Sequence, residues 1–279
     1  MITTCKGRLH HLKQTLPLMV AQHPDELVVV DYNCPDGTGD WVAARYPDVT
    51  VVRVPDGLEF SASHARNVGV AQTNSQWLAF VDADIRIDAR WSGWMRENLV
   101  PGKYCRPVEH GGGRDLETFG TSICARSDFD AVGGFDEALK GWSGENFDFF
   151  SRLADRGLTL KGFPSEFIDP IRHGDEERAS FEGMAGKDER ILLVVCYTEA
   201  KRQLQAMLNR PEGLSFDERV RVRDTILEKL KAWHDGGEAE PLIVRFAFDR
   251  GTRKPAANYT MKTKTVVAFE IDAGQRGGG

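Results

Sequence analysis

The feature that most constrains the fold is an apolar run, Trp77 to Val81, that ends in two carboxylates, Asp82 and Asp84. A short continuous apolar run is typical of a strand covered on both faces, as in parallel sheets. Ligands of such sheets bind outside the carboxyl ends of the strands, where both aspartates would lie. Two carboxylates brought together there need a cation or hydrogen-bond donors to offset their charge. The pattern favours either a divalent ion beside a diphosphate or an acidic turn in which one aspartate caps the next segment.

Strand-like and helix-like segments alternate through the first third of the chain. Strands are predicted at residues 1–5, 26–31, 49–54 and 77–81, with helices between them at 9–20, 39–46 and 61–71. This alternation predicts an α/β fold with a mostly parallel, Rossmann-like sheet flanked by helices. After Asp88 the alternation loosens. Strands are expected at 119–125, 159–163 and 167–171, and helices at 127–132 and 146–156.

The character of the sequence changes beyond Asp175, and a boundary is predicted near residue 180. Residues 1–180 are expected to form the domain that carries the sheet, and residues 181–279 a C-terminal extension. Within the extension we expect a helical hairpin, a short β-pair and a disordered glycine tip: 192–208 with 216–234, 242–249 with 259–271, and 277–279. No chemical motif marks the extension, so a packing element is preferred and a homo-oligomer formed through it is left open.

Composition excludes several classes of protein. A net charge of −6 argues against a general electrostatic grip on nucleic acid or on an anionic membrane. No apolar stretch reaches the length of a membrane span, and the strand predicted at residue 1 leaves no room for a signal peptide, so a cytoplasmic location is expected. The five cysteines are scattered without zinc-site spacing and are expected to be reduced.

Charged residues also end the other predicted strands. Lys6 and Arg8 follow the first strand, where they could reach a diphosphate; solvated loop charges are the alternative. Asp31 ends the next strand, where it could accept hydrogen bonds from a nucleobase or cap a turn. Arg66 lies in a helix with apolar neighbours, which requires an anionic partner, either a ligand or a structural ion pair.

Two later segments carry side chains suited to ligands. Trp142 stands between glycines, where its flat face could stack on a sugar ring or a base. Glu145 starts the following helix, whose dipole favours the ionised carboxylate even if the residue is only an N-terminal helix charge. His173 follows an apolar segment at a strand end; it is either structural or the imidazole ligand of a manganese-like ion.

Together and in order, these segments resemble the GT-A fold glycosyltransferases of family 2 and their galactosyltransferase relatives, over residues 1 to about 178. Residues 2–8 look like the first-strand nucleotide loop, residues 29–38 like the acidic run that cradles uracil, residues 65–69 like the Ala-Arg-Asn-X-Gly helix, and residues 82–84 like the Asp-X-Asp metal motif. Residues 133–137 and 141–145 resemble the acceptor-side signature of β-1,4-galactosyltransferases and polypeptide N-acetylgalactosaminyltransferases, and residues 171–173 the segment with a late metal-binding histidine.

The resemblance implies a role for each matched residue. Asp84 and His173 would bind the metal ion, Mn²⁺ or Mg²⁺, and Asp82 would contact the sugar, the ribose or, through water, the metal. The residues expected at the nucleotide and its diphosphate are Thr4, Lys6, Arg8, Asp31 and Arg66. The residues expected on the acceptor side are Trp142, Glu145 and Asn146, with Glu145 or Asp148 acting on the acceptor hydroxyl.

Two departures from the family pattern matter. Inverting members usually follow the glutamate with an aspartate that serves as general base, but here Asn146 stands in that place, and an amide cannot take a proton at neutral pH. The Glu-Asn pair is similar to that of the retaining N-acetylgalactosaminyltransferases, so the stereochemistry is left open. Pro170 stands where some galactosyltransferases have a metal-binding methionine, and water is expected in its place.

The resemblance thus implies metal-dependent transfer of a sugar from a nucleotide sugar, with a UDP-sugar preferred, to a hydroxyl of a glycan, a protein or another acceptor. A nucleic-acid acceptor is not expected. One alternative is a catalytically idle nucleotide-sugar-binding or scaffold protein, suggested by Asn146. Another is a nucleotidyltransferase, which is disfavoured because the loop after the first strand contains only one glycine, Gly7. The sugar and the acceptor are left open.

Overall fold

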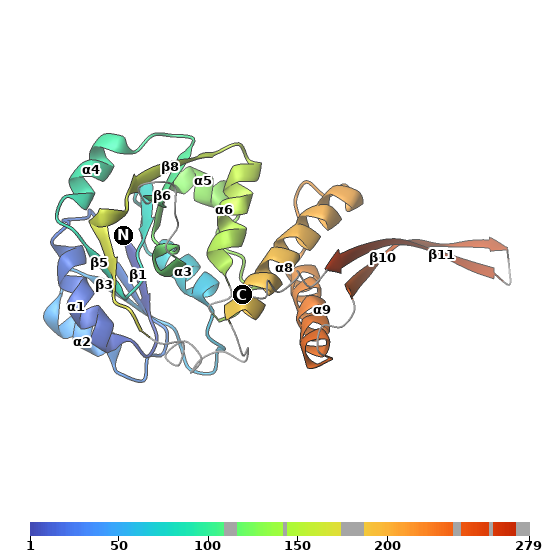
Figure 1. Ribbon diagram of the computed structural model, residues 1–279, viewed down its shortest axis with the longest axis horizontal. Coiled ribbons are helices and arrows are strands. Elements are labelled where there is room, and N and C mark those ends of the chain that lie inside the picture. Colours follow the sequence, from blue (N-terminus) through green and yellow to red (C-terminus); the bar gives the residue numbers. More distant parts are fainter. Residues whose placement is uncertain (109–115, 142–143, 174–186, 237–240, 257–258, 272–279) are drawn as a thin grey trace, which may run out of the picture. The chain divides into compact units, whose positions relative to one another are not determined.

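The structure, a computed structural model, describes residues 1–108, 116–141, 144–173, 187–236, 241–256 and 259–271 (Figure 1). The chain divides into two compact units, Met1–Ala185 and Gly186–Gly279. This division lies a few residues beyond the boundary predicted near residue 180. The disordered tip predicted at the terminal glycines lies outside the described residues.

The first unit is built on a seven-stranded sheet with the order β3-β2-β1-β4-β7-β6-β8. Its strands are β1 (Ile2–Cys5), β2 (Val28–Asp31), β3 (Thr50–Arg53), β4 (Trp77–Phe80), β6 (Lys103–Val108), β7 (Ser122–Ala125) and β8 (Thr159–Pro164). β1 to β4 are parallel, β7 runs antiparallel to both β4 and β6, and β6 and β8 are parallel. The sheet is therefore mostly parallel, as the sequence predicted.

Helices cover both faces of this sheet (Figure 1). The helices of the first unit are α1 (Leu9–Val20), α2 (Thr38–Arg45), α3 (Ala62–Val70), α4 (Trp91–Asn98), α5 (Arg126–Ala131) and α6 (Glu145–Asp155). Because successive strand residues point to opposite faces, Val29 of β2 joins a core with Leu16 of α1, whereas Val28 joins a core with Ala65 of α3 and Phe149 of α6. The predicted alternation of strand and helix thus yields two apolar cores, one on each face.

A second, two-stranded sheet was not predicted from the sequence. β5 (Ile85–Ile87) pairs antiparallel with β9 (Ile168–Pro170), which lies more than eighty residues later in the chain. The Ile171 amide extends the pairing and donates to the Asp84 carbonyl at 2.7 Å. Strands of three residues give too short a pattern to recognise, yet this pair joins the loop after β4 to the segment that ends in His173.

Other differences from the predicted elements lie between residues 88 and 125. Helix α4 and strand β6 were missed, and β7 begins at Ser122 rather than at residue 119 because a turn and a 3-10 helix, η1 (Leu116–Thr118), precede it. The five cysteines are unpaired, and Cys5, Cys34, Cys105 and Cys124 are buried.

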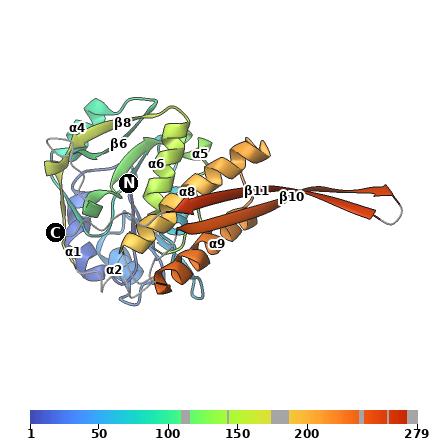
Figure 2. The same ribbon diagram turned by 45° about the vertical axis from the view of Figure 1, so that its right-hand side comes forward.

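The second unit contains a helical hairpin and a β-ribbon. Its elements are α8 (Lys187–Leu208), α9 (Phe216–Asp235), β10 (Leu242–Ala256) and β11 (Tyr259–Ile271). Ser215 and Glu218 form a capping box that starts α9. The first strand of the predicted β-pair was too short, because pairing continues past an irregularity between Asp249 and Gly251, whereas the second has the predicted bounds. The ribbon reaches well beyond the two helices (Figure 2). Among the helices of the described residues, none is long and apolar enough to cross a membrane.

Candidate functional site

Three loops follow the parallel strands β2, β1 and β4, which are neighbours in that order in the sheet. They carry Cys34 and Asp36 after β2, Arg8 after β1, and Asp82 and Asp84 after β4. Carboxyl ends of adjacent parallel strands lie at one edge of a sheet, and this edge is where α/β proteins bind their ligands. The structure therefore brings three of the predicted site residues, Arg8, Asp82 and Asp84, to one edge of the sheet.

The first group of side chains at this edge joins Asp84 to His173, three residues after β9. Asp84 Oδ2 lies 2.9 Å from His173 Nε2 and accepts a hydrogen bond from Arg8 Nη1 at 2.7 Å. Arg8 Nη1 is also 3.1 Å from His173 Nε2. The side chains of Asp84 and His173 are 10% and 2% exposed, so this is a buried polar group. The predicted pairing of Asp84 with His173 is present in the structure.

The electrostatics of this group keep the carboxylate charged. Burial works to raise the pKa of Asp84, but the hydrogen bond with His173 and the positive charge of Arg8 hold that pKa below its usual range. A buried carboxylate that stays ionised needs a nearby cation. Arg8 supplies that positive charge here.

A histidine that the sequence motifs did not mark lies in the same place. His11, in the first turn of α1, is 4% exposed, and ligand atoms of His11, Asp84 and His173 all lie within 4.8 Å of one another. The helical spacing of Leu12, Leu16 and Met19 gave the apolar face of α1, but nothing in that pattern showed that an adjacent histidine would face the acidic loop after β4.

This donor set fits a divalent transition ion. Two imidazoles and one carboxylate suit manganese-like or zinc-like ions. The separation of 2.9 Å between Asp84 Oδ2 and His173 Nε2 matches the roughly 3 Å between adjacent ligands of an ion with bonds of about 2.1 Å. The Arg8 guanidinium, a cation, already lies against both atoms. The residues that could hold a metal ion are therefore His11, Asp84 and His173.

The second group of side chains surrounds Arg66 of α3. Arg66 donates to Asp82 Oδ1 at 2.8 Å through Nη2 and to Glu145 Oε1 through Nη1. Its side chain and that of Glu145 are each 3% exposed. Burial and the nearby Asp84 raise the pKa of Asp82, while the Arg66 guanidinium lowers it. The structure thus places Asp82 on Arg66 and outside the group of His11, Asp84 and His173, and its predicted contact with the sugar, the ribose or, through water, the metal stays a prediction.

The start of α3 determines where Glu145 lies. Ser61 caps α3 by accepting from the His64 amide at 3.2 Å, and its hydroxyl donates to the Leu139 carbonyl at 3.0 Å. The Gly141 amide donates to the Phe60 carbonyl at 2.8 Å, four residues before Glu145. These bonds fix Leu139 and Gly141 at the start of α3, close in the chain to Glu145, which contacts Arg66.

Asn67, the neighbour of Arg66, has a structural role. Its side-chain nitrogen donates to the Phe135 carbonyl at 2.9 Å and to Glu137 at 2.8 Å, and its side-chain oxygen accepts from the Phe135 amide at 2.9 Å. The segment 133–137 is thereby held on α3. Arg66 therefore binds Glu145 at the start of α6, and Asn67 binds the segment 133–137.

The residues that follow Glu145 differ in what they face. Asn146 donates to Glu145 Oε1 at 3.1 Å, and its buried carbonyl oxygen has no hydrogen-bond partner among the described residues. Asp148 is fully buried and accepts from Arg152 Nε at 2.8 Å. Arg152 also donates to backbone carbonyls of the segment 132–134. The geometry therefore gives Asp148 a structural ion pair, whereas Glu145 and Asn146 lie beside Arg66.

The predicted nucleotide residues occupy the loops after β1 and β2. Asp31 accepts from the Cys34 and Gly39 amides, both at 2.7 Å, so it holds the loop after β2 in its turn. Lys6 Nζ lies over the Tyr32 ring, 5.8 Å from its centroid. Thr4 is buried in β1 opposite Val30 of β2. Contacts of these residues with a nucleotide stay predictions, and Trp142 lies outside the described residues.

The loop after β2 contains a thiol with an unusual pKa. The hydrogen bond from the Cys5 thiol lowers the pKa of Cys34 to about 6, against the effect of burial, which raises it. The Gly7 amide also donates to the Cys34 sulfur at 3.1 Å. Cys34 is therefore expected to be a thiolate at neutral pH, a point that the sequence gave no means to predict.

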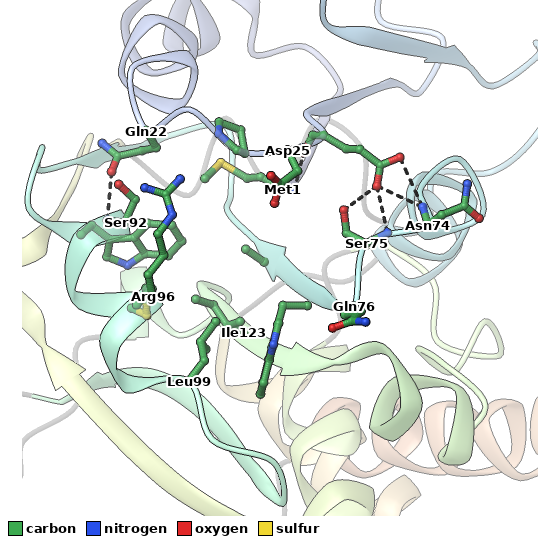
Figure 3. A pocket seen from close by; sticks show the side chains of 16 residues that line it. Met1, Gln22, Asp25, Asn74, Ser75, Gln76, Ser92, Arg96, Leu99 and Ile123 are labelled. Atoms are coloured by element: carbon green, nitrogen blue, oxygen red, sulfur yellow. Dashed lines mark hydrogen bonds between the residues drawn. The ribbon is translucent and has the colours of Figure 1, made fainter.

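A cavity of about 440 Å³ lies elsewhere in the first unit (Figure 3). It is lined by Met1 and Trp77, which are at the amino ends of β1 and β4, and by Ser92 and Arg96 of α4. Figure 3 shows Gln22 bonded to Ser92, whose amide donates to Gln22 Oε1 at 3.1 Å. Because it opens at the amino ends of the strands, this cavity is separate from the group of site residues at their carboxyl ends.

Two family models match the first unit. Residues 1–99 match the model described as glycosyl transferase family 2, and residues 112–174 match the model described as N-terminal domain of galactosyltransferase. The first match ends beyond Asp84, and the second includes Glu145 and His173. The two matches together span the residues that form both groups of the site.

Solved glycosyltransferase structures share the fold at low sequence identity. A mannosyltransferase from Pyrobaculum calidifontis, PcManGT, is 16% identical, with a TM-score of 0.50, and the alignment covers 85% of this chain and 78% of that one. TarS from S. aureus is 16% identical, with a TM-score of 0.53 and coverage of 84% and 72%. GalNAc-T7 is 16% identical, with a TM-score of 0.53, and the alignment covers 86% of this chain and 57% of that one. The two family matches, together with the shared fold, support a GT-A glycosyltransferase similar to those of family 2.

Proposed function

We propose that this glycosyltransferase transfers a sugar from a nucleotide sugar, a UDP-sugar, to a hydroxyl acceptor, with a divalent ion held by Asp84 and His173. The observation that carries the proposal is the contact between Asp84 Oδ2 and His173 Nε2 at 2.9 Å, beside Arg8 and at the carboxyl ends of β1 and β4. PcManGT was solved with GDP-Man and Mn²⁺, TarS with UDP-GlcNAc, and GalNAc-T7 with UDP, GalNAc and Mn²⁺, which supports this class of donor and ion.

In this proposal the residues after β1 and β2 bind the nucleotide. Arg8 lies against the ion's ligands and presents a guanidinium suited to phosphate oxygens, and Lys6 follows the same strand. Thr4 and Asp31 support the loops that face the base and the ribose. When bound, a divalent ion supplies the charge that neutralises the leaving diphosphate.

The residues beside Arg66 are proposed to serve the transferred sugar and the acceptor. Arg66 and Asp82 are held together, so Asp82 presents its carboxylate toward the sugar in a fixed orientation. The buried carbonyl oxygen of Asn146 lacks a partner among the described residues, and a sugar hydroxyl could satisfy it. Glu145 acts as the base if the reaction inverts, or orients the acceptor if it retains. Trp142 is proposed to stack on the acceptor.

A thermal-shift experiment tests the donor and the ion together. UDP-, GDP- and dTDP-sugars are added to the full chain with Mn²⁺ or with EDTA. Ligand at about one hundred times its Kd stabilises a protein by about 2.7 kcal/mol, so a UDP-sugar with Mn²⁺ is expected to raise the Tm by about 5 °C or more. A shift that is unchanged by EDTA, or one given only by GDP- or dTDP-sugars, would contradict the proposal.

Cys34 provides an independent reporter of nucleotide binding. With a pKa of about 6, the rate of its alkylation by iodoacetamide is expected to fall to about one tenth of the plateau rate at pH 5. UDP with Mn²⁺ is expected to slow this reaction at pH 7, since the thiol lies in the loop after β2. Mass spectrometry measures the modification. Cys196 is the internal control because burial raises the pKa of its thiol to about 11. Alkylation of Cys34 that begins only above pH 8 would contradict the low pKa of its thiol. An alkylation rate that UDP does not change would count against nucleotide binding beside the loop after β2.

A further inference from the structure

The candidate metal ligands of the first unit include a residue from an unexpected element. His11 belongs to α1, whereas Asp84 follows β4 and His173 follows β9. The rings of His11 and His173 are stacked, with centroids 5.3 Å apart and an interplanar angle of 28°. We propose that His11 is the third protein ligand of the metal ion, and that this ligand makes the site select Mn²⁺ over Mg²⁺. The inference rests on the proposed function because it concerns the same ion.

The fold fixes His11 in this position. Thr15 lies one helical turn after His11 on the same face of α1, and its hydroxyl donates to the Ala83 carbonyl at 2.7 Å. Ala83 stands between the two aspartates of the loop, so this bond fixes α1 relative to Asp84. His11 is 4% exposed and does not reach the site as a mobile surface side chain. The ligand set is therefore assembled by packing before any ion binds.

The charge already present at this place is that of a cation. Arg8 Nη1 contacts Asp84 Oδ2 at 2.7 Å and His173 Nε2 at 3.1 Å. A carboxylate and an imidazole nitrogen that converge on one positively charged group have the arrangement that a metal ion requires. A divalent ion bound to the same two atoms takes over the neutralisation of Asp84. Arg8 is then available to the diphosphate.

The composition of the set determines which ion it prefers. Mg²⁺ favours oxygen ligands and keeps several waters, whereas imidazole nitrogen suits transition ions. One histidine beside Asp84 leaves a site that both ions can occupy, and a second histidine moves the preference toward Mn²⁺. Pro170 stands where some galactosyltransferases have a metal-binding methionine, and the sequence predicted a water ligand there. In this assignment His11 supplies a further protein ligand, from α1.

The test compares His11→Ala with His10→Ala in the full chain. His10 precedes His11 in α1 but is exposed, so it is a matched control. Mn²⁺ alone is titrated, and free Mn²⁺ is measured by its EPR signal. The Kd for Mn²⁺ is expected to rise at least about 10-fold in His11→Ala and to change less than about 2-fold in His10→Ala. The Kd for Mg²⁺, obtained by competition, is expected to change less than about 3-fold. An unchanged Mn²⁺ affinity in a folded His11→Ala variant overturns the proposal.

A second measurement needs no variant. Pulsed EPR of Mn²⁺ bound to the wild-type chain, prepared with ¹⁵N-histidine and with natural nitrogen, counts the coordinated imidazoles. Two histidine nitrogens are expected. A single histidine nitrogen overturns the inference but leaves the proposed function standing, because Asp84 and His173 still bind the ion. If His11→Ala loses Mn²⁺ binding but Asp84→Asn keeps it, the proposed function fails instead, because the ion then does not bind at Asp84.

Discussion

Replacement of Asp84 by asparagine is expected to lower the rate of metal-dependent sugar transfer by about 1000-fold. Asparagine keeps the size of the side chain and one acceptor oxygen but removes the charge that faces Arg8 and His173. Charge neutralisation by an ion at a leaving diphosphate contributes several kcal/mol, and about 4 kcal/mol corresponds to that factor in rate. The initial rate of UDP release from a UDP-sugar, measured at saturating Mn²⁺, gives the result.

Two other aspartates of the same segment serve as controls. Asp88 is paired with Arg90 at the surface, and Asp88→Asn is expected to change the rate of UDP release less than about 2-fold. Asp82 is paired with Arg66, so Asp82→Asn is expected to keep Mn²⁺ binding within about 5-fold of the wild type, whereas Asp84→Asn abolishes that binding. The comparison separates Asp84, the proposed ligand of the ion, from Asp82, the residue proposed to face the sugar.

The opposite result has a clear meaning. Suppose that Asp84→Asn retains its Tm and binds Mn²⁺ less tightly. If it still releases UDP in EDTA as fast as the wild type does at saturating Mn²⁺, then the transfer does not use the ion. The proposal for Asp84 and His173 would then be wrong. Because removal of the charge leaves Arg8 buried beside His173, the Tm and the near-UV circular dichroism of the variant must be recorded first.

Much of the fold could be predicted because β1 to β4 can each be recognised from a local sequence pattern. β1 to β4 and the helices between them each gave a pattern of adequate length, and the parallel order follows from helical connections. The pair of β5 and β9 could not be predicted in the same way. Each strand has only three residues, and their pairing joins segments more than eighty residues apart. Such pairing depends on tertiary packing and not on local propensity.

The candidate site was predictable to a similar extent. The resemblance to a family brought Asp84 and His173 together, and their contact is present in the structure. It did not show that Asp82 would turn to Arg66, because two residues of one short loop can face different neighbours. It also did not show His11, whose direction depends on the bond between Thr15 and the Ala83 carbonyl. Contacts made by loop backbone and helix register leave no periodic signal in a sequence.

Replacement of Glu145 by glutamine is expected to lower kcat by about 100-fold while the Kd of the UDP-sugar changes less than about 3-fold. Glu145 contacts Arg66 and Asn146 on the proposed acceptor side, and no interaction joins it to the loops after β1 and β2 among the described residues. Glutamine keeps a side-chain oxygen for Arg66 but can neither take a proton nor carry the charge. Steady-state rates with a saturating acceptor, and donor titration by calorimetry, give the two quantities. Equal losses in both would assign Glu145 a structural role instead.

The contrast with Asp148→Asn makes this prediction specific, since Asp148 lies one helical turn after Glu145 in α6. Asp148 is fully buried and pairs with Arg152, so its replacement by asparagine leaves a partly buried guanidinium without this counter-charge. The expected effect is a loss of about 2 kcal/mol in the free energy of unfolding, measured by urea denaturation. At 25 °C the loss of kcat is expected to be at least about tenfold smaller than that of Glu145→Gln. If the two variants instead exchange these effects, the acid that acts on the acceptor is Asp148, and α6 must move to expose this buried side chain.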